Sequence, residues 1–187
     1  MIDINISDIK WMKRAIYLAS LGKGRTSPNP MVGAVILDKN GNLISEGFHS
    51  KSGMPHAEAM AFNNLKKDAR GGTIYVNLEP CCHQGKTPPC VDKIISFGIK
   101  KVFISIEDPD KRVSGKGIKL LKDAGIKVHQ GLCEREALEL NKSFIHRNIT
   151  DNAFGVMKWA MSMDGRVGLK NGKSKWITNK DSRSLVH

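Results

Sequence analysis

The fold and chemistry of this chain are indicated by two short stretches, His56-Ala57-Glu58 and Glu79-Pro80-Cys81-Cys82-His83-Gln84-Gly85-Lys86-Thr87-Pro88-Pro89-Cys90. They supply one imidazole and two thiolates, a set that suits zinc, and three protein ligands leave the fourth tetrahedral position open for water. Glu58 is too near His56 in sequence to be an ordinary fourth ligand. We therefore expect Glu58 to be the base that takes a proton from that water.

Two neighbouring side chains are rival metal ligands. Cys82 and His83 could each reach the same ion, and a fourth protein ligand would give a closed structural site. We interpret Cys82 as a packed neighbour and Cys133, far along the chain, as a structural thiol. Because no secretory context is evident, the four cysteines favour metal or thiol chemistry over disulfides.

The composition is that of an ordinary globular protein with a basic surface. The 187 residues are 40% hydrophobic, which is enough for one domain with a remainder or for two small domains. The net charge of +12 is spread along the chain with acidic residues in between, a pattern more typical of a solvated surface than of a nucleic-acid site. There is neither a long apolar run nor a signal-peptide pattern, so we expect no membrane span and a cytoplasmic location.

Signals for helices and strands alternate along the chain. We predict helices at 7–21 (with Ser7 as N-cap), 56–67, about 90–98 and 117–124, strands at 31–37, 43–48, 73–78, 101–106 and 126–129, and a closing amphipathic segment at 134–148. Such an alternation after an initial hairpin predicts an α/β fold in which a mixed sheet is covered by helices on both faces.

This layout places the candidate ligands at the ends of regular elements. His56 is expected in the first turn of a helix, Cys81 just past the end of a strand, and Cys90 near the start of the next helix. Helix N-termini carry partial positive charge, which favours thiolates and therefore metal binding. Zinc with an open position lowers the pKa of bound water to about 7, so the pattern predicts hydrolytic chemistry.

The same pattern is typical of zinc deaminases that act on nucleobase-like rings. In the usual nucleoside deaminases two residues separate the cysteines, whereas here eight lie between Cys81 and Cys90. The insert carries His83 and Lys86, and a lysine beside a glycine near a catalytic pocket suits a phosphate group. The alternative is that Lys86 is simply a solvated loop residue.

Over essentially all of residues 7–187 the chain resembles the bifunctional riboflavin-biosynthesis deaminase/reductase family. The resemblance is carried by 26–35, 47–49, 56–58, 78–90, Asp108-Pro109-Asp110 and Gly115-Lys116-Gly117, which are similar to the deaminase half. It implies the three-layer α/β/α sandwich of the cytidine-deaminase type.

The resemblance also implies a reaction, the zinc-dependent hydrolytic deamination of 2,5-diamino-6-ribosylamino-4(3H)-pyrimidinone 5′-phosphate to 5-amino-6-(5-phosphoribosylamino)uracil. Asp110 departs from the family's usual asparagine, so no ligand contact is carried over to it. The matching functional positions are the zinc ligands His56, Cys81 and Cys90, the proton shuttle Glu58, the substrate-facing Asn29, His49 and His83, the phosphate-holding Lys86, and Asp108 lining the pocket.

The end of the chain, through residues 156–166 and 174–178, resembles the opening of the family's NADPH-dependent reductase domain. The resemblance implies that Ala160 and Trp176 match cofactor positions and Ser174 a substrate position. A dinucleotide site needs a full nucleotide-binding sheet, which residues 151–187 are too few to form. We therefore expect a deaminase domain at 1–150, an incomplete reductase-like segment at 151–187, and neither NADPH binding nor reductase activity without a complete reductase domain.

Two other classes of protein stay open. A tRNA adenosine deaminase or another nucleobase zinc deaminase would share the histidine-alanine-glutamate and proline-cysteine motifs, although the insert and the tail count against it. A non-enzymatic zinc-binding or nucleic-acid module would complete its metal shell with a ligand such as His83. As partners we expect a small phosphorylated pyrimidine, a second copy of the chain and a separate reductase chain, and neither a membrane nor nucleic acid.

Overall fold

The computed structural model describes residues 5–83, 88–111 and 113–186. The chain divides into two units, Met1–Asn152 and Ala153–His187, and each is described by itself. Within the described residues, no helix is long and apolar enough to cross a membrane.

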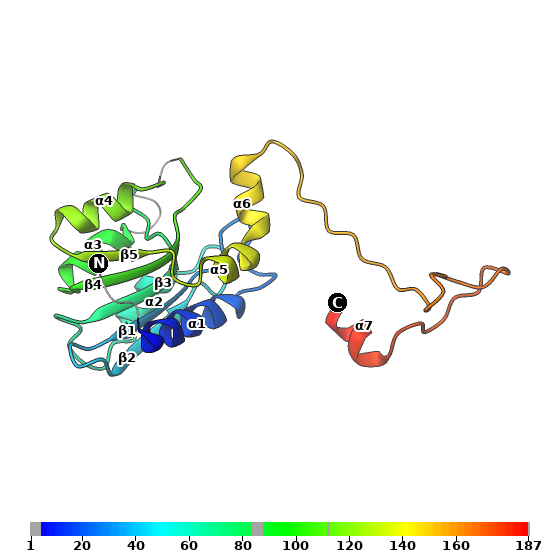
Figure 1. Cartoon of the computed structure of the whole chain (residues 1–187), viewed down its shortest axis with the longest axis horizontal. Coiled ribbons are helices and arrows are strands. Elements are labelled where there is room, and N and C mark those ends of the chain that lie inside the picture. Colours follow the sequence, from blue (N-terminus) through cyan, green and yellow to red (C-terminus); the bar gives the residue numbers. More distant parts are fainter. Residues whose placement is uncertain (1–4, 84–87, 112, 187) are drawn as a thin grey trace. The chain divides into compact units, whose positions relative to one another are not determined.

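The first unit is built on a five-stranded sheet in the order β2-β1-β3-β4-β5 (Figure 1). β1 is antiparallel to both β2 and β3, whereas β3, β4 and β5 run parallel to one another. The strands are β1 (Gly33–Leu37), β2 (Leu43–Phe48), β3 (Thr73–Leu78), β4 (Lys101–Ile106) and β5 (Lys127–Gln130). The parallel strands all end at the same edge of the sheet, and the candidate site lies beyond that edge.

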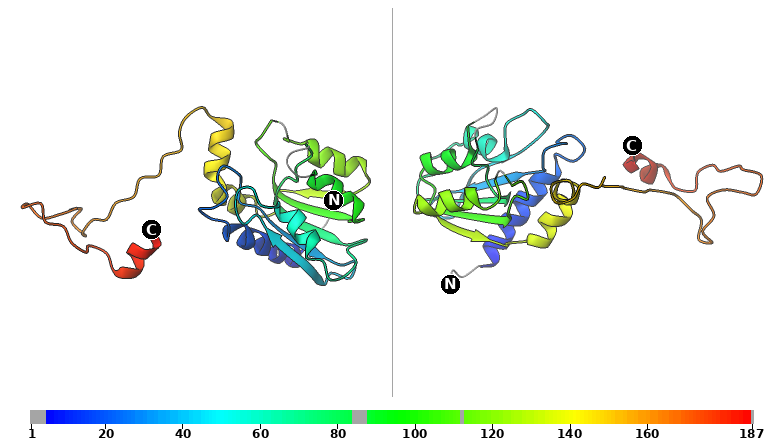
Figure 2. Two further views of the ribbon diagram at one scale, coloured as in Figure 1. Left: turned by 180° about the vertical axis from the view of Figure 1, so that it is seen from behind. Right: turned by 90° about the horizontal axis from the view of Figure 1, so that it is seen from above.

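Helices cover both faces of this sheet (Figure 2). α1 (Ile6–Ser20) packs on β1 and β3, and α5 (Glu134–Leu140) packs on β4 beside it. On the other face, α2 (Ala57–Asn63) packs on β1 and β2, α3 (Cys90–Ser96) lies between α2 and α4, and α4 (Lys116–Asp123) lies beside β5. The predicted α/β/α sandwich with a mixed sheet is confirmed.

The core alternates along the strands, as expected for a sheet that is buried on both faces. One set of buried side chains faces α2, α3 and α4, and includes Ile36, Val76 and Ile104. The other set faces α1. It contains a stack of three rings, in which Tyr75 lies 4.8 Å from Phe103 and Phe103 lies 4.3 Å from His129.

Two helices differ from the prediction, α1 in its N-cap and α2 in its C-terminal end. α1 is capped by Asn5 and not by Ser7, because the Asn5 side chain accepts a hydrogen bond from Asp8 N while Asp8 accepts one from Asn5 N, a capping box. α2 begins at Ala57 and ends at Asn63, well short of the predicted Lys67. Asn63 and Asn64 have low helix propensity because their amides compete for backbone hydrogen bonds, which accounts for the early end.

The predicted closing segment at 134–148 is two helices, α5 and α6 (Lys142–Ile149), that meet at Asn141. The Asn141 side chain is 1% exposed and pairs with the backbone of Met31, accepting from its N–H at 2.8 Å and donating to its carbonyl at 2.9 Å. Asn77 donates to the same carbonyl at 3.0 Å. These side-chain bonds replace strand pairing at Met31, so β1 begins at Gly33 and not at the predicted Met31.

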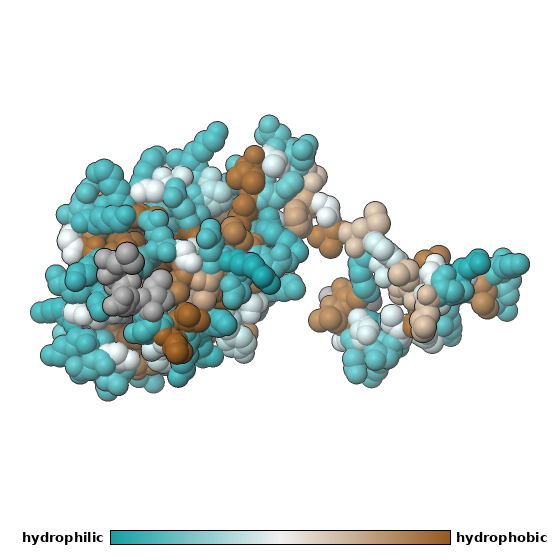
Figure 3. Space-filling view, viewed as in Figure 1, coloured by the Kyte–Doolittle hydropathy of each residue, from teal (hydrophilic) through white to brown (hydrophobic). Residues whose placement is uncertain are grey.

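The second unit is an extended segment with one helix, α7 (Lys180–Val186). Its large apolar side chains are mostly exposed (Figure 3). They include Met157, Trp159, Met163, Leu169 and Trp176. A folded domain rarely leaves this many large apolar side chains exposed to water.

Candidate metal centre and active-site pocket

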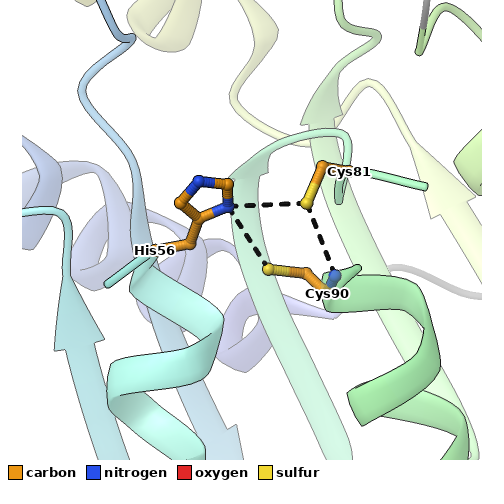
Figure 4. A group of neighbouring side chains, drawn as sticks. All are labelled: His56, Cys81 and Cys90. Atoms are coloured by element: carbon orange, nitrogen blue, oxygen red, sulfur yellow. Dashed lines mark hydrogen bonds between the residues drawn. The ribbon is translucent and has the colours of Figure 1, made fainter. Parts of the chain in front are cut away.

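Three side chains converge beyond the carboxyl end of β3 and form what we call the metal cluster: His56, Cys81 and Cys90 (Figure 4). The distance from His56 Nδ1 is 3.4 Å to Cys81 Sγ and 3.5 Å to Cys90 Sγ. The Cys90 backbone N–H, at the first residue of α3, donates to Cys81 Sγ at 3.4 Å. Among the described residues, these three form the group of potential ligands whose donor atoms all lie within 4.8 Å of one another.

Each ligand is placed by the end of a regular element. Cys81 follows β3 and Cys90 begins α3, both as predicted. His56 was predicted inside the first helical turn, but it is the N-cap of α2, with an extended backbone (φ −65°, ψ 159°). The His56 side chain makes no capping hydrogen bond, so its ring is free to face the two cysteines.

The donor set fits a zinc ion. Tetrahedral angles and the usual Zn–N and Zn–S bond lengths place a nitrogen and a sulfur ligand about 3.5 Å apart, which the two observed distances match. A hydrogen bond from Cys90 lowers the pKa of the Cys81 thiol, while the same contact and burial raise the pKa of Cys90. At least the Cys81 sulfur is therefore favoured as a thiolate, the form of cysteine that binds zinc.

The rival ligands lie differently. Cys82 is half-buried and packs against the apolar core, as we interpreted it from the sequence. His83 lines the pocket beside the metal cluster but is not part of the cluster. Its Nδ1 is buried, and no hydrogen-bond partner for it is found among the described residues. Cys133 is half-buried at the N-cap of α5.

Glu58 lies in the first turn of α2 and is 3% exposed. Burial raises the pKa of its carboxyl to about 7. A group that exchanges protons near neutral pH is suited to general acid–base work. Glu58 lines the same pocket as His56 and Cys81, so its carboxyl is adjacent to the metal cluster.

The pocket brings together most of the residues that the sequence singled out. Its walls include the metal cluster's His56 and Cys81 together with Asn29, His49, Glu58, His83 and Asp108. Asp110 also lines the pocket, and its N–H donates to Asp108 Oδ1 at 2.9 Å. Burial raises the pKa of Asp108 to about 6. Lys86 lies outside the described residues.

His49 and Asn29 form a chain of hydrogen bonds at the edge of the pocket. His49 Nδ1 lies 3.0 Å from the Pro55 carbonyl, which can only accept, so Nδ1 carries the proton. His49 Nε2 then accepts from the Asn29 amide nitrogen at 3.2 Å. This arrangement fixes the orientation of the Asn29 amide and leaves its oxygen available to a ligand.

Sequence reasoning missed the part of the pocket that α6 supplies. Phe144, Arg147 and Asn148 all line it. The Arg147 guanidinium reaches across to the Pro28 carbonyl at 2.8 Å, linking residues 119 positions apart. The amphipathic pattern at 134–148 was visible in the sequence, but nothing in it indicated which end of the sheet the segment would reach.

The tail residues lie in the second unit. Ala160, Ser174 and Trp176 line a shallow hollow there. The Trp176 side chain is 65% exposed, and the Arg183 guanidinium stacks 3.8 Å above its ring.

The fold and the metal cluster together define a zinc-binding deaminase domain. The family model of the cytidine and deoxycytidylate deaminase zinc-binding region matches residues 5–106, which include all three members of the cluster and Glu58. This chain therefore belongs to the cytidine and deoxycytidylate deaminase zinc-binding family. The predicted zinc cofactor agrees with this family and with the donor set.

Several relatives at 45–48% identity are riboflavin biosynthesis proteins. The chain is 47% identical to the riboflavin biosynthesis protein RibD of Aquifex aeolicus over 180 residues, which cover 96% of this chain and 50% of that protein. A Thermotoga maritima diaminohydroxyphosphoribosylaminopyrimidine deaminase/5-amino-6-(5-phosphoribosylamino)uracil reductase matches with a TM-score of 0.89 and 45% identity, over 95% of this chain and 51% of that one. The structure of Acinetobacter baumannii RibD matches with a TM-score of 0.87 and 46% identity, over 96% of this chain and 50% of that one. The chain thus spans about half the length of these relatives, and the resemblance found in the sequence is confirmed.

Proposed function

We propose that this chain is a zinc-dependent aminohydrolase of riboflavin biosynthesis. Its substrate is 2,5-diamino-6-ribosylamino-4(3H)-pyrimidinone 5′-phosphate, and its products are 5-amino-6-(5-phosphoribosylamino)uracil and ammonia. The observation that carries the proposal is one pocket in which a His/Cys/Cys cluster lies beside a buried glutamate. The Thermotoga maritima relative, which bears the name of this deaminase, supports the choice of substrate.

Zinc, when held by His56, Cys81 and Cys90, supplies an activated water with a pKa of about 7. In the overall reaction that water provides the new carbonyl oxygen, and the ring C–N bond to the amino group breaks. Glu58 would accept one proton from the water and deliver it to the ring nitrogen. It would then carry the second proton, from the new hydroxyl group, to the amino group, which would leave as ammonia. Its burial keeps this proton transfer apart from bulk solvent.

Substrate recognition is assigned to the side chains around the cluster. The oriented Asn29 amide, His83 and Asp108 are suited to the polar edge of a pyrimidine ring. Lys86 is assigned to the 5′-phosphate, on the resemblance alone. Arg147 is a second cation at the pocket, and its fork of N–H donors suits a phosphate or ribose oxygen.

The domain organisation and the partners belong to the same proposal. Residues 1–150 would be the deaminase domain and 151–187 the opening of a reductase-like domain, which the division near Asn152 and the exposed apolar side chains of the tail support. A separate reductase chain is then a candidate partner, and a homo-oligomer stays a prediction for light scattering. Reduced cysteines at 81, 82, 90 and 133 favour a cytoplasmic location.

The decisive experiment compares substrates. The purified, zinc-loaded chain is incubated with the diaminopyrimidine phosphate and, separately, with tRNA, and ammonia release is followed. We expect release from the pyrimidine alone, and none from a Glu58→Gln variant. Release from tRNA only would replace the proposal by a tRNA adenosine deaminase, whereas zinc binding without release from any nucleobase would favour a non-enzymatic module.

A further inference from the structure

Glu79 is a buried carboxylate that the proposed reaction does not use. It follows β3 directly and precedes Pro80-Cys81, and only 3% of the residue is exposed. An ionised carboxylate in such a place is unfavourable unless hydrogen bonds replace its lost hydration. Its partners therefore indicate why it is there.

Among the described residues, its three hydrogen-bond partners are backbone N–H groups from one later segment of the chain. Glu79 Oε2 accepts from Asp108 N at 3.2 Å and from Gly115 N at 2.9 Å. Glu79 Oε1 accepts from Ile118 N at 3.1 Å. Both carboxylate oxygens are thus occupied by the segment between Asp108 and Ile118, which lies 29 to 39 residues further along the chain.

Glu79 also caps α4 from a distance. The N-cap of α4 is Gly115, which has φ 73° and no side chain to offer to the first turn. Glu79 supplies the missing acceptor to Ile118 N, and its negative charge is favourable at a helix N-terminus. Contact here is close, because a Cβ on Gly117 would lie 2.3 Å from the Pro80 carbonyl oxygen. The start of α4 is therefore fastened directly to the loop that carries Cys81.

The segment held in this way forms one wall of the pocket. Asp108, Asp110 and Val113 all line the pocket. Asp108 carries the first N–H group that Glu79 binds, and the other two residues lie between it and Gly115, which carries the second. The two ends of this wall are thus fixed to the residue next but one to a metal ligand. A change in the Glu79 side chain would move the wall relative to the metal cluster.

We propose that Glu79 is a positioning residue. Its carboxylate holds Asp108, Gly115 and Ile118 close to Pro80-Cys81. It thereby sets the distance between the metal cluster and the wall that receives the substrate ring. Glu79 also lines the pocket, but three of its acceptor sites already bind backbone N–H groups. The part of this inference that concerns substrate rests on the proposed function, and the part that concerns the segment does not.

The test is Glu79→Gln, which puts an NH₂ group where one of the backbone N–H donors needs an acceptor. We expect KM for the diaminopyrimidine phosphate to rise about tenfold, kcat to change less, and zinc content to stay the same. We also expect faster hydrogen–deuterium exchange at the amides of Asp108, Gly115 and Ile118 than in the wild type. Exchange is measured without substrate, so it decides the role of Glu79 even if the chain proves to have another activity.

The matched control is Tyr75→Phe, which removes a buried 2.6 Å hydrogen bond to Asp8 on the α1 face of the sheet. It should lower Tm and leave KM and the three amides unchanged. A Glu79→Gln variant that behaves like this control, or that loses zinc, overturns the proposal. If Glu79→Gln does not fold, Glu79→Asp keeps the charge but shortens the reach by one methylene, and unchanged exchange and KM in that variant overturn the proposal equally.

Discussion

The metal cluster and another part of the pocket lining are held in place by different means. The cluster uses positions at the ends of β3, α2 and α3, so regular structure alone brings His56, Cys81 and Cys90 together. We call the part of the pocket lining formed by Asp108, Asp110, Val113, Phe144, Arg147 and Asn148 the outer wall. Side chains hold it through bonds to distant backbone groups. Glu79 accepts from the N–H groups of Asp108 and Gly115, and Asn141, at the start of α6, bonds to the backbone of Met31.

This difference separates the chemistry of the site from its selectivity. Residues that provide ligands and the proton shuttle come from 35 consecutive positions, 56 to 90, and need only the local α/β order. Residues that shape the space for the ring and its substituents depend on a few buried polar side chains. Substitutions in the first group should therefore abolish turnover, and those in the second should change KM and stability.

The largest effect is expected at the proton shuttle. Glu58→Gln should lower the rate of ammonia release by about 10²- to 10⁴-fold, because an amide cannot accept the water's proton. Zinc should stay at about one per chain, as measured by metal analysis. Glu139→Gln, which alters an exposed carboxylate paired with Lys142, is the control and should leave the rate unchanged. Loss of zinc in Glu58→Gln would mean that Glu58 is a ligand.

A smaller effect is expected at the two cations, and it distinguishes their roles. Lys86→Ala should weaken binding of the phosphorylated substrate about tenfold to hundredfold and leave the dephosphorylated nucleoside nearly unaffected, because a charge-assisted contact is lost. Arg147→Ala should weaken both ligands similarly by a few fold, since it releases the Pro28 carbonyl. The loss of affinity in each variant is measured from inhibition constants for both ligands at two salt concentrations.

If Arg147→Ala weakened only the phosphorylated ligand and Lys86→Ala weakened both ligands equally, the phosphate contact would belong to Arg147 and the loop-supporting role to Lys86. Equal losses for both ligands in both variants would leave neither cation as the phosphate contact.

The junction of α5 and α6 should matter for stability more than for chemistry. Asn141→Ala leaves the part-buried Met31 N–H without its acceptor and should cost about 1–3 kcal/mol of unfolding free energy. KM should rise a few fold because α6 carries Arg147, and zinc content should not change. Denaturant unfolding checks the first expectation, with Asn63→Ala on exposed α2 surface as the control. A variant as stable as the wild type would show that Asn141 does not hold the wall.

The smallest effect is expected on the far face of the sheet, at His129. Its Nε2 is buried, no partner for it is found among the described residues, and burial lowers its pKa. The unfolded chain therefore binds this proton more tightly than the folded one, so stability decreases as pH falls through the histidine's pKa. His129→Phe should keep the ring stacked on Phe103 and raise Tm by about 2–4 °C. The decrease of Tm below pH 6 should be smaller in this variant than in the wild type.

Activity should be the same in His129→Phe and the wild type, because His129 faces the α1 side of the sheet. A change in KM would contradict the separation between this face and the pocket.

The contrast between the metal cluster and the outer wall also explains how much of the molecule could be predicted from the sequence. The alternation of strands and helices, the mixed sheet and the convergence of His56, Cys81 and Cys90 follow from periodicity and motif spacing, which are local properties. Glu58 was identified by its place two residues after a ligand. Helix ends at Asn63 and Asn141 were missed because there the outcome depends on how an amide side chain is used.

The outer wall could not be predicted for a related reason. Glu79 stands within the motif that was recognised, yet its partners at Asp108, Gly115 and Ile118 are backbone groups, which leave no trace in the identity of those residues. The bond from Arg147 also ends on a backbone carbonyl. Only Gly117 offers a signal in the sequence, because a glycine permits close approach of another part of the chain. It does not indicate that the approaching group is the Pro80 carbonyl.

The bond between Asn141 and Met31 has a consequence for the order in which the protein is made. It spans 110 residues, so during synthesis from the N-terminus the substrate loop at Asn29 emerges long before the residue that will hold it. All three metal ligands have emerged once Cys90 is made. Contacts between distant residues form late because a long loop must first be closed. A nascent chain thus completes its metal ligands while the pocket is still open on one side, and the last helix of the unit closes it.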